Sequence, residues 1–305
     1  VLTWLQRLQG QLNGPLSLQS GKQSPLVSAL TRSAEEAGAT VRLNAHVQRI
    51  LIDNGKAIGV ELPSGEILQA RIVISNADPR STFTKLVGAP LLDAMFANRV
   101  TQIRGAGVVA KLHLALSGKP SIAGLPASQL GSRILVAPSM QYIERAFNHS
   151  KYGEYSEHPV LDITIPSLHR DDLAPAGHHV MSVNVAYVPY SLDRGWDDQK
   201  ANFASSVISE LGHYFPDLDS LLVDHELLTP GDIEEQFLAS QGHWHHGELA
   251  LHQSFMLRPV YGAAQYDTPI GGLFLCGAGS HPGGDLTGLP GRNAAKRVLE
   301  LGGSR

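Results

Sequence analysis

Residues 271–303, GGLFLCGAGSHPGGDLTGLPGRNAAKRVLELGG, constrain the fold of this chain more than any other segment. An apolar run at 273–276 precedes a loop with five glycines between 277 and 288, and apolar residues then recur at helical spacing. This order predicts a buried strand, a glycine-rich loop and a helix that Pro290 can open and Gly302 can end. Because glycine has no Cβ, a ligand can approach such a loop closely. The loop N–H groups and the helix dipole favour a negative group there.

The spacing of these glycines does not match a known phosphate loop. No Gly-Lys-Ser/Thr follows, and Gly277-Ala278-Gly279 leads into Ser280, His281 and Pro282 instead of completing a dinucleotide fingerprint. Two interpretations therefore stay open on spacing alone. A ligand approaches here, or the loop is a tight connection that binds nothing.

The patterns upstream predict a small α/β unit followed by a different kind of segment. Asn54-Gly55 is the strongest hairpin signal, because both turn residues must tolerate positive φ. Pro79 stops the last strand of this unit and can open a helix. The expected elements are a helix at 25–37 and strands at 41–43, 47–53, 57–62, 66–68 and 70–75.

The middle of the chain, 76–270, has long alternating strands that favour an antiparallel α+β arrangement. The expected elements are strands at 108–116, 160–166 and 179–188, a helix at 197–214 and a shorter helix after Pro230.

Composition excludes several classes of protein. The 305 residues leave room for about two domains. The formal charge of −4 and the absence of a basic run exclude a nucleic-acid footprint. The single cysteine, Cys276, excludes a disulfide scaffold.

The apolar stretch 105–117 is interrupted by Lys111 and His113, so we expect no transmembrane segment. The N-terminal residues have no initiator Met and no signal-peptide layout, which favours a cytoplasmic protein or a piece of one.

The other candidate sites are weak. The run His243, His245 and His246, with His252, has no acid in a useful register and no cysteine partner, so we expect no metal site. Cys276 with His281 could suggest a thiol nucleophile. A lone cysteine at the end of a buried strand is more often a small apolar residue.

The run LFLCGAGSHPGGDLTGLPGRNAA (273–295) resembles the C-terminal flavin-binding signature of FAD-dependent oxidoreductases of the phytoene desaturase (carotenoid desaturase) type. The whole stretch from about Gly21 to Arg305 is similar to the branch that includes the pyridine nucleotide-disulphide oxidoreductase domain-containing proteins. The other segments that carry this resemblance are 35–66, 75–78, 174–190, 227–237 and 242–259.

The resemblance implies a fold and a division into domains. Enzymes of this type bind the FAD pyrophosphate with an N-terminal strand–GxGxxG–helix unit, and this sequence contains no GxGxxG. It therefore looks like the C-terminal part of a flavoenzyme, of mixed α/β plus α+β class. A partial FAD-binding (Rossmann-like) domain would comprise 1–75 and 271–305. An antiparallel-sheet substrate-binding domain, 76–270, would be inserted into it.

The resemblance also implies site residues. Val47 corresponds to a position that contacts the adenine end of FAD, and Asp285 either holds a ribityl hydroxyl or caps the helix. His246, Glu248 and Arg258 are candidates for facing the substrate. The remaining cofactor-binding candidates, at the ribityl–pyrophosphate stretch and the flavin pyrimidine edge, are Gly277, Ala278, Gly279, Leu286, Thr287 and Gly288.

The implied activity is hydride transfer between a C–H bond of an apolar, polyene- or lipid-like substrate and FAD, the cofactor expected for the full-length family. One alternative is a non-catalytic domain that holds no FAD by itself. Another, an amine oxidase of the same broad superfamily, would need an aromatic cage at the flavin. A missing N-terminal lobe would leave apolar surface exposed, which predicts self-association and allows peripheral membrane contact.

Overall fold

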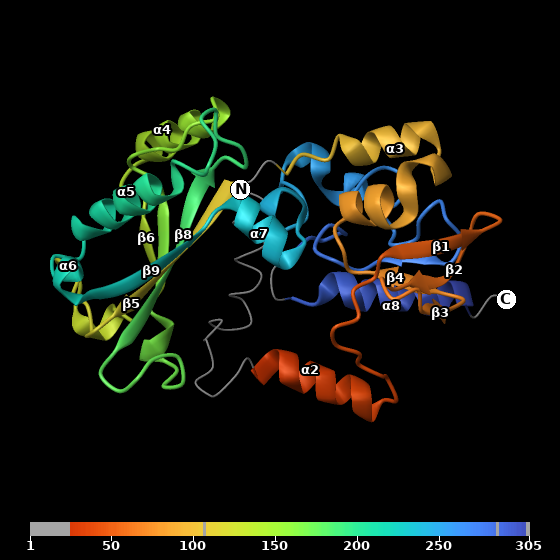
Figure 1. The fold of residues 1–305 in the computed structure, drawn as a ribbon, viewed down its shortest axis with the longest axis horizontal. Coiled ribbons are helices and arrows are strands. Elements are labelled where there is room, and N and C mark those ends of the chain that lie inside the picture. The colour runs from red at the N-terminus through yellow and green to blue at the C-terminus, as the bar shows by residue number, and fades with distance from the viewer. Residues whose placement is uncertain (1–24, 106–107, 285–286, 303–305) are drawn as a thin grey trace. The chain divides into compact units, whose positions relative to one another are not determined.

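The computed structural model describes residues 25–105, 108–284 and 287–302 of the chain, and they form two compact units. Unit 1 comprises residues 42–105 and 234–302, and unit 2 comprises 25–41 and 108–233 (Figure 1). Each unit has its own apolar core. In the described part of the chain, no helix combines the length and apolar character that crossing a membrane requires.

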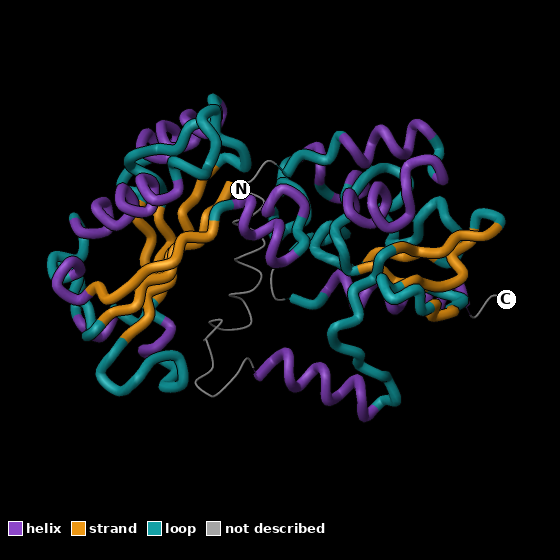
Figure 2. Tube along the Cα trace, in the orientation of Figure 1, coloured by secondary structure: helices purple, strands orange, loops and turns teal. Residues whose placement is uncertain are grey.

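Unit 2 contains a five-stranded antiparallel sheet, in the order β6 (Ile134–Val136), β7 (Leu161–Thr164), β8 (His179–Val188), β5 (Val108–Leu116) and β9 (Leu222–Leu228). One face of the sheet is its core, because Ala110, Leu112 and Leu114 alternate with less buried residues along β5. Helix α5 (Lys200–Gly212) lies along the sheet (Figure 2), and its Phe203 and Val207 belong to this core. The elements of unit 2 are helices α2 (Pro25–Glu36), α4 (Met140–Lys151), α5 (Lys200–Gly212) and α6 (Leu218–Leu221), and strands β5 (Val108–Leu116), β6 (Ile134–Val136), β7 (Leu161–Thr164), β8 (His179–Val188) and β9 (Leu222–Leu228).

Unit 1 combines a three-stranded antiparallel meander with a parallel pair of strands. Strands β1 (Arg49–Asp53), β2 (Lys56–Glu61) and β3 (Ile67–Gln69) form the meander, and β4 (Val73–Ser75) pairs in parallel with β10 (Leu273–Leu275). In the core, the rings of Phe83 and Phe96 pack edge to face, with their centroids 4.8 Å apart. The helices are a π-helical segment (Ser81–Gly88), α3 (Ala94–Thr101) and α8 (Leu289–Gly302), and α7 (Pro230–Phe237) crosses the boundary between the units.

Most of the expected elements are present: the strands at 108–116 and 179–188 have the expected bounds, and the ends of the others shift by up to three residues. The strand expected at 41–43 is wrong: this stretch has no strand partner among the described residues, and Leu43 is 81% exposed. The expected domain bounds differ from the compact units, because residues 76–105 and 234–270 belong to unit 1 and residues 25–41 belong to unit 2. The functional assignment of the two parts stays a prediction.

The turn between β1 and β2 explains the Asn54-Gly55 signal. Asn54 has φ +46° and Gly55 has φ +74°, so both occupy the left-handed region that a tight hairpin requires. We expect Gly55→Ala to lower the free energy of unfolding by about 1 kcal/mol, because a Cβ disfavours this conformation. Gly291→Ala, in α8 with no atom near its added Cβ, should instead stabilise the protein by up to about 1 kcal/mol. Urea denaturation of both variants checks the prediction, and equal effects would contradict it.

Candidate functional site

The parallel strands β4 and β10 end at the same edge of their small sheet, and this brings two chain segments together. The backbone N–H of Cys276 donates to the carbonyl oxygen of Ser75 at 3.0 Å. A Cβ at Gly277 would lie 2.7 Å from the carbonyl oxygen of Asn76, and one at Gly279 would lie 2.6 Å from Pro79. The glycine loop therefore packs directly on the segment that follows β4. Carboxyl ends of parallel strands are where α/β proteins place their ligands.

Asp78, in the segment after β4, is buried and joins two distant parts of unit 1. Its Oδ1 accepts the N–H of Ser81 at 2.9 Å, and its Oδ2 accepts the N–H of Ser240 at 3.2 Å and its hydroxyl at 2.9 Å. Burial alone would raise the pKa of Asp78. The hydrogen bonds from Ser81 and Ser240 outweigh burial, so the pKa lies below its ordinary value and the carboxylate stays ionised.

Arg258 is 3% exposed, and its guanidinium donates to four backbone carbonyl oxygens. Nη2 reaches the oxygens of His245 at 2.6 Å and of Ala278 at 2.9 Å. Nη1 reaches those of Glu248 and Gln253, both at 3.3 Å. These partners are neutral, and among the described residues no carboxylate forms an ion pair with Arg258. Burial lowers the pKa of Arg258 to about 10, which leaves it charged at neutral pH.

Four buried side-chain atoms around this loop have no hydrogen-bond partner among the described residues: Arg258 Nε, Ser280 Oγ, His243 Nδ1 and His246 Nδ1. Burial, followed by the charges of His245, Arg258 and His246, lowers the pKa of His243 to about 4. Burial lowers the pKa of His246 as well, although Asp78 opposes this. Both imidazoles are therefore neutral at pH 7. Unpartnered buried polar atoms are rare in folded proteins, so such a group of them indicates a polar ligand or water.

The structure brings six of the predicted residues together. Gly277, Ala278 and Gly279 contact the segment of His246, Glu248 and Arg258. Glu248 contributes through its backbone, since its carbonyl oxygen accepts from Arg258, while its carboxylate lies 3.7 Å from Arg104 Nε.

The other predicted residues lie elsewhere. Val47 is half-buried two residues before β1. Thr287 and Gly288 are exposed where α8 begins, and Thr287 Oγ1 accepts the N–H of Leu289 at 3.3 Å. Asp285 and Leu286 lie outside the described residues. Burial raises the pKa of Cys276, whose Sγ lies 3.6 Å from the carbonyl oxygen of Ser75. A neutral thiol is a poor nucleophile.

Asp78 and Ser240 are functional candidates that the sequence did not single out. The available signal was Asp78-Pro79, because an acid followed by proline is typical of a helix start. Nothing local indicated Ser240, which is 162 residues away along the chain.

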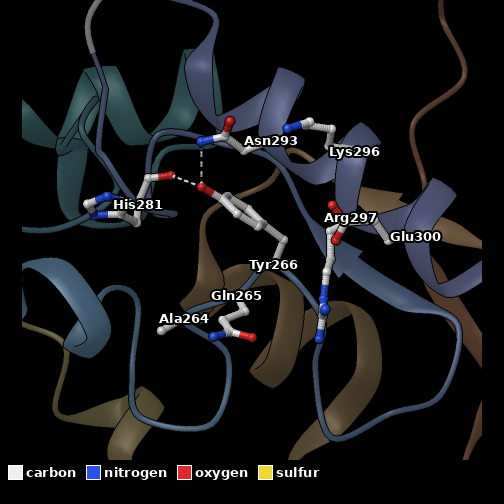
Figure 3. Close-up of a pocket in the computed structure, with 8 residues that line it drawn as sticks. All are labelled: Ala264, Gln265, Tyr266, His281, Asn293, Lys296, Arg297 and Glu300. Atoms are coloured by element: carbon white, nitrogen blue, oxygen red, sulfur yellow. Dashed lines mark hydrogen bonds between the residues drawn. The ribbon is translucent and has the colours of Figure 1, made fainter.

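A polar pocket of about 340 Å³ lies beside α8 in unit 1, which is the lower end of the range for ligand sites (Figure 3). The hydroxyl of Tyr266 donates to the carbonyl oxygen of His281 at 2.7 Å and accepts from Asn293 Nδ2 at 2.8 Å. The lining residues are Ala264, Gln265, Tyr266, His281, Asn293, Lys296, Arg297 and Glu300. No pattern in the sequence indicated a pocket here.

A second set of polar residues lies on the non-core face of the sheet in unit 2. Lys111 on β5 pairs in register with Asn184 on β8, which pairs with Asp162 on β7. Lys111 Nζ donates to Asn184 Oδ1 at 2.7 Å, and Asn184 Nδ2 donates to Asp162 Oδ2 at 3.4 Å. Arg133 forms an ion pair with Asp162. We call Arg133, Asp162, Asn184 and Lys111 the polar row. Lys111 was visible in the sequence only as an interruption of an apolar strand.

Comparison with known proteins agrees with this fold and with the resemblance. Residues 4–299 match the family described as flavin containing amine oxidoreductase, so the chain belongs to that family. The predicted similarity to the C-terminal part of phytoene desaturase-type FAD oxidoreductases is confirmed.

Two relatives and one solved structure illustrate the match. The chain is 33% identical over 300 residues to pyridine nucleotide-disulfide oxidoreductase domain-containing protein 2 of Rattus norvegicus, covering 94% of this chain and 52% of that protein. It is 28% identical to a phytoene desaturase (lycopene-forming) of Pantoea ananas, covering 92% and 55%. An oxidoreductase from Methanosarcina mazei superposes with a TM-score of 0.52 at 16% identity, covering 90% and 53%, and this shows the fold alone. The chain spans about half the length of the relatives it matches.

Proposed function

We propose that this chain forms part of an FAD-dependent oxidoreductase that oxidises a C–H bond of a lipid-like substrate, and that the Gly277–Ser280 loop and Arg258 meet the flavin. The family supports a flavin cofactor. The observation that carries the assignment to this loop is the group of four buried, unpartnered polar atoms beside it.

These atoms match the polar edge of a flavin in their hydrogen-bonding chemistry, and because each is buried in the described fold, contact requires the covering segment to move. The pyrimidine edge of the isoalloxazine carries two carbonyl oxygens and an N–H, and it becomes negative on reduction. Arg258 supplies a buried positive charge with no carboxylate partner among the described residues, and its Nε has a hydrogen to donate. The hydroxyl of Ser280 can donate or accept. The start of α8 adds N–H groups and the positive end of a helix dipole.

Each residue then has a limited task, since the bound flavin itself accepts the hydride. Arg258 holds the loop in place through Ala278 and carries the balancing charge. The neutral His243 and His246 add no further positive charge to the site. Thr287 and Gly288 at the start of α8, and Val47 near the adenine end, keep the cofactor contacts that the resemblance implies.

A second candidate function is a domain that holds no FAD by itself, and the glycine contacts favour it. At Gly277, Gly279 and Gly284, the space that a Cβ would occupy is already filled by Asn76, Pro79 and His245. Internal packing thus accounts for three glycines of the loop. In that case the orphaned polar atoms are satisfied by water.

A flavin titration decides between the two candidates. FAD is added to the purified chain, and quenching of flavin fluorescence and the visible absorption band are followed. Saturable binding supports the proposal, and no binding supports the second candidate. Riboflavin serves as a second probe, because contacts at the isoalloxazine alone should still bind it, more weakly.

Ser280→Ala tests the loop itself. The Ser280 hydroxyl is buried without a partner, so its removal breaks no hydrogen bond and relieves an unsatisfied group. The free energy of unfolding should therefore not fall and should rise by up to about 1 kcal/mol. If this hydroxyl contacts the flavin, the dissociation constant should rise by roughly fivefold, corresponding to about 1 kcal/mol. Ser64→Ala, in the exposed β2–β3 turn, is the matched control and should change neither quantity. Unaltered flavin affinity in Ser280→Ala would show that the Ser280 hydroxyl does not contact the flavin.

The remaining assignments are also proposals. An apolar substrate agrees with the relative named phytoene desaturase. Self-association and peripheral membrane contact are supported by the exposed apolar side chains of Leu251, Phe255 and Met256. The cytoplasmic location stays a prediction.

A further inference from the structure

The polar row of unit 2 stands out because of its position. The same strands bury an apolar core on their other face, where Leu112 and Val183 are fully buried. On the row's own face, Lys111 and Asn184 are half-buried within the described chain. A half-buried lysine in the centre of a sheet costs solvation free energy, so its retention needs a reason.

The charges of the row do not balance. The carboxylate of Asp162 already forms an ion pair with Arg133. The short contact of Lys111, at 2.7 Å, is to the neutral amide of Asn184. Burial lowers the pKa of Lys111 and Arg133 lowers it further, while Asp162 raises it. With two cations and one carboxylate, the four residues of the row carry a net positive charge. Glu226 of β9 lies on the same face but pairs in register with His113, not with Lys111, so an anion at Lys111 would still gain a charge-assisted hydrogen bond.

Apolar positions continue from the row on the same face. Val109 and Ala186 pair in register, two residues along β5 and β8 from Lys111 and Asn184. Across the sheet, on the strand next to Asp162, Leu135 of β6 pairs in register with Asp162 and is 64% exposed. In the other direction along the strands, the next pair on this face is polar, His113 with Ser182. A cationic centre with apolar positions on one side matches a molecule that has an anionic head and an apolar body.

We propose that the polar row binds the carboxylate head of an amphipathic, polyene- or fatty-acid-like substrate, with Lys111 as its charge partner. This inference rests on the proposed function and narrows its substrate class. A pure hydrocarbon would cover the Lys111 ammonium without replacing its water contacts, which is unfavourable. A carboxylate replaces them with a charge-assisted hydrogen bond.

The test compares an acid with its neutral ester. cis-Parinaric acid is a fluorescent polyene carboxylate, and its methyl ester has the same body without the charge. Both are titrated into the purified chain, which needs no flavin for this assay. We expect the acid to bind at least about tenfold more tightly than the ester, since a hydrogen bond to a charged group contributes that much. In Lys111→Met, the preference should fall below about twofold.

Two further variants separate charge from structure. Lys111→Arg keeps the charge and should keep most of the preference. Lys119→Met removes an exposed lysine of the same unit and should keep all of it. Circular dichroism confirms that each variant is folded. Equal binding of acid and ester, an undiminished preference in Lys111→Met, or no saturable binding of either probe would each overturn the inference. Because flavin binding is measured separately, the failure of one proposal is distinguishable from the failure of the other.

Discussion

Replacing Arg258 with alanine should lower the free energy of unfolding of unit 1 by about 3–5 kcal/mol, the largest effect we expect for any single substitution in this site. Four backbone carbonyl oxygens, of His245, Glu248, Gln253 and Ala278, would lose their guanidinium donors. Three of these four oxygens lie in segment 245–253 and the fourth in the glycine loop. The variant therefore removes the hydrogen bonds through which Arg258 joins the glycine loop to segment 245–253.

The lysine variant distinguishes charge from geometry. Arg258→Lys keeps a positive charge, but one ammonium cannot reach carbonyl groups that the guanidinium contacts through two separate nitrogens. We expect it to recover no more than about half of the loss. The measurement is urea denaturation followed by fluorescence and circular dichroism. Arg71→Ala, at an exposed arginine of the same unit, is the control and should change the free energy of unfolding by less than about 0.5 kcal/mol. If Arg258→Ala unfolds at the same urea concentration as Arg71→Ala, the hydrogen bonds of Arg258 do not stabilise unit 1 as proposed.

Strands β5, β7 and β8 of unit 2 were predictable because their residues obey one rule, whereas the sequence did not indicate β6 and β9. In β5, every second residue faces the helices, so Ala110, Leu112 and Leu114 alternate with Val109, Lys111 and His113. The Asn54-Gly55 turn was predictable for a similarly local reason, the backbone conformation that its two residues tolerate. The false strand at 41–43 had the right local composition, yet a strand needs a partner, and composition does not show one.

The candidate site was only half predictable. The glycine loop has a local signal, because a strand, glycines and a helix follow one another. Its covering segment has none: Leu238, Gln241, His246 and Phe255 all have positive φ, and such irregular backbone leaves no periodicity to read. The contact between Arg258 and Ala278 depends on that irregular path. The polar row was hidden for another reason, since 73 residues separate Lys111 from Asn184 and only the register of β5 and β8 joins them.

Asp78→Ala should lower the free energy of unfolding by about 2–4 kcal/mol, because three donors from Ser81 and Ser240, buried or partly buried, would lose their acceptor. Asp93→Ala is the matched control. Asp93 caps α3 by the same geometry, accepting from Met95 and Phe96, but it is exposed. The usual loss for such a cap is about 1 kcal/mol. Burial is therefore the source of the expected difference between the two variants, and equal losses in urea denaturation would contradict it.

The pH dependence of Asp78→Asn gives a second, independent signature. The pKa of Asp78 is lower in the folded protein than its unfolded value of about 3.9, because its hydrogen bonds outweigh burial. Its contribution is thus fully present above about pH 4 and is lost as the pH falls through the folded pKa. The buried His243 and His246, with lowered pKa values, also favour unfolding as the pH falls below about 6.5. Asp78 raises the pKa of His246, so the carboxylate is isolated in a His246→Gln background, where that histidine is absent from both proteins. In this background, the difference in free energy of unfolding made by Asp78→Asn should stay constant from pH 8 to about pH 5 and shrink below about pH 4. A difference that grows on acidification would show that Asp78 is protonated in the fold.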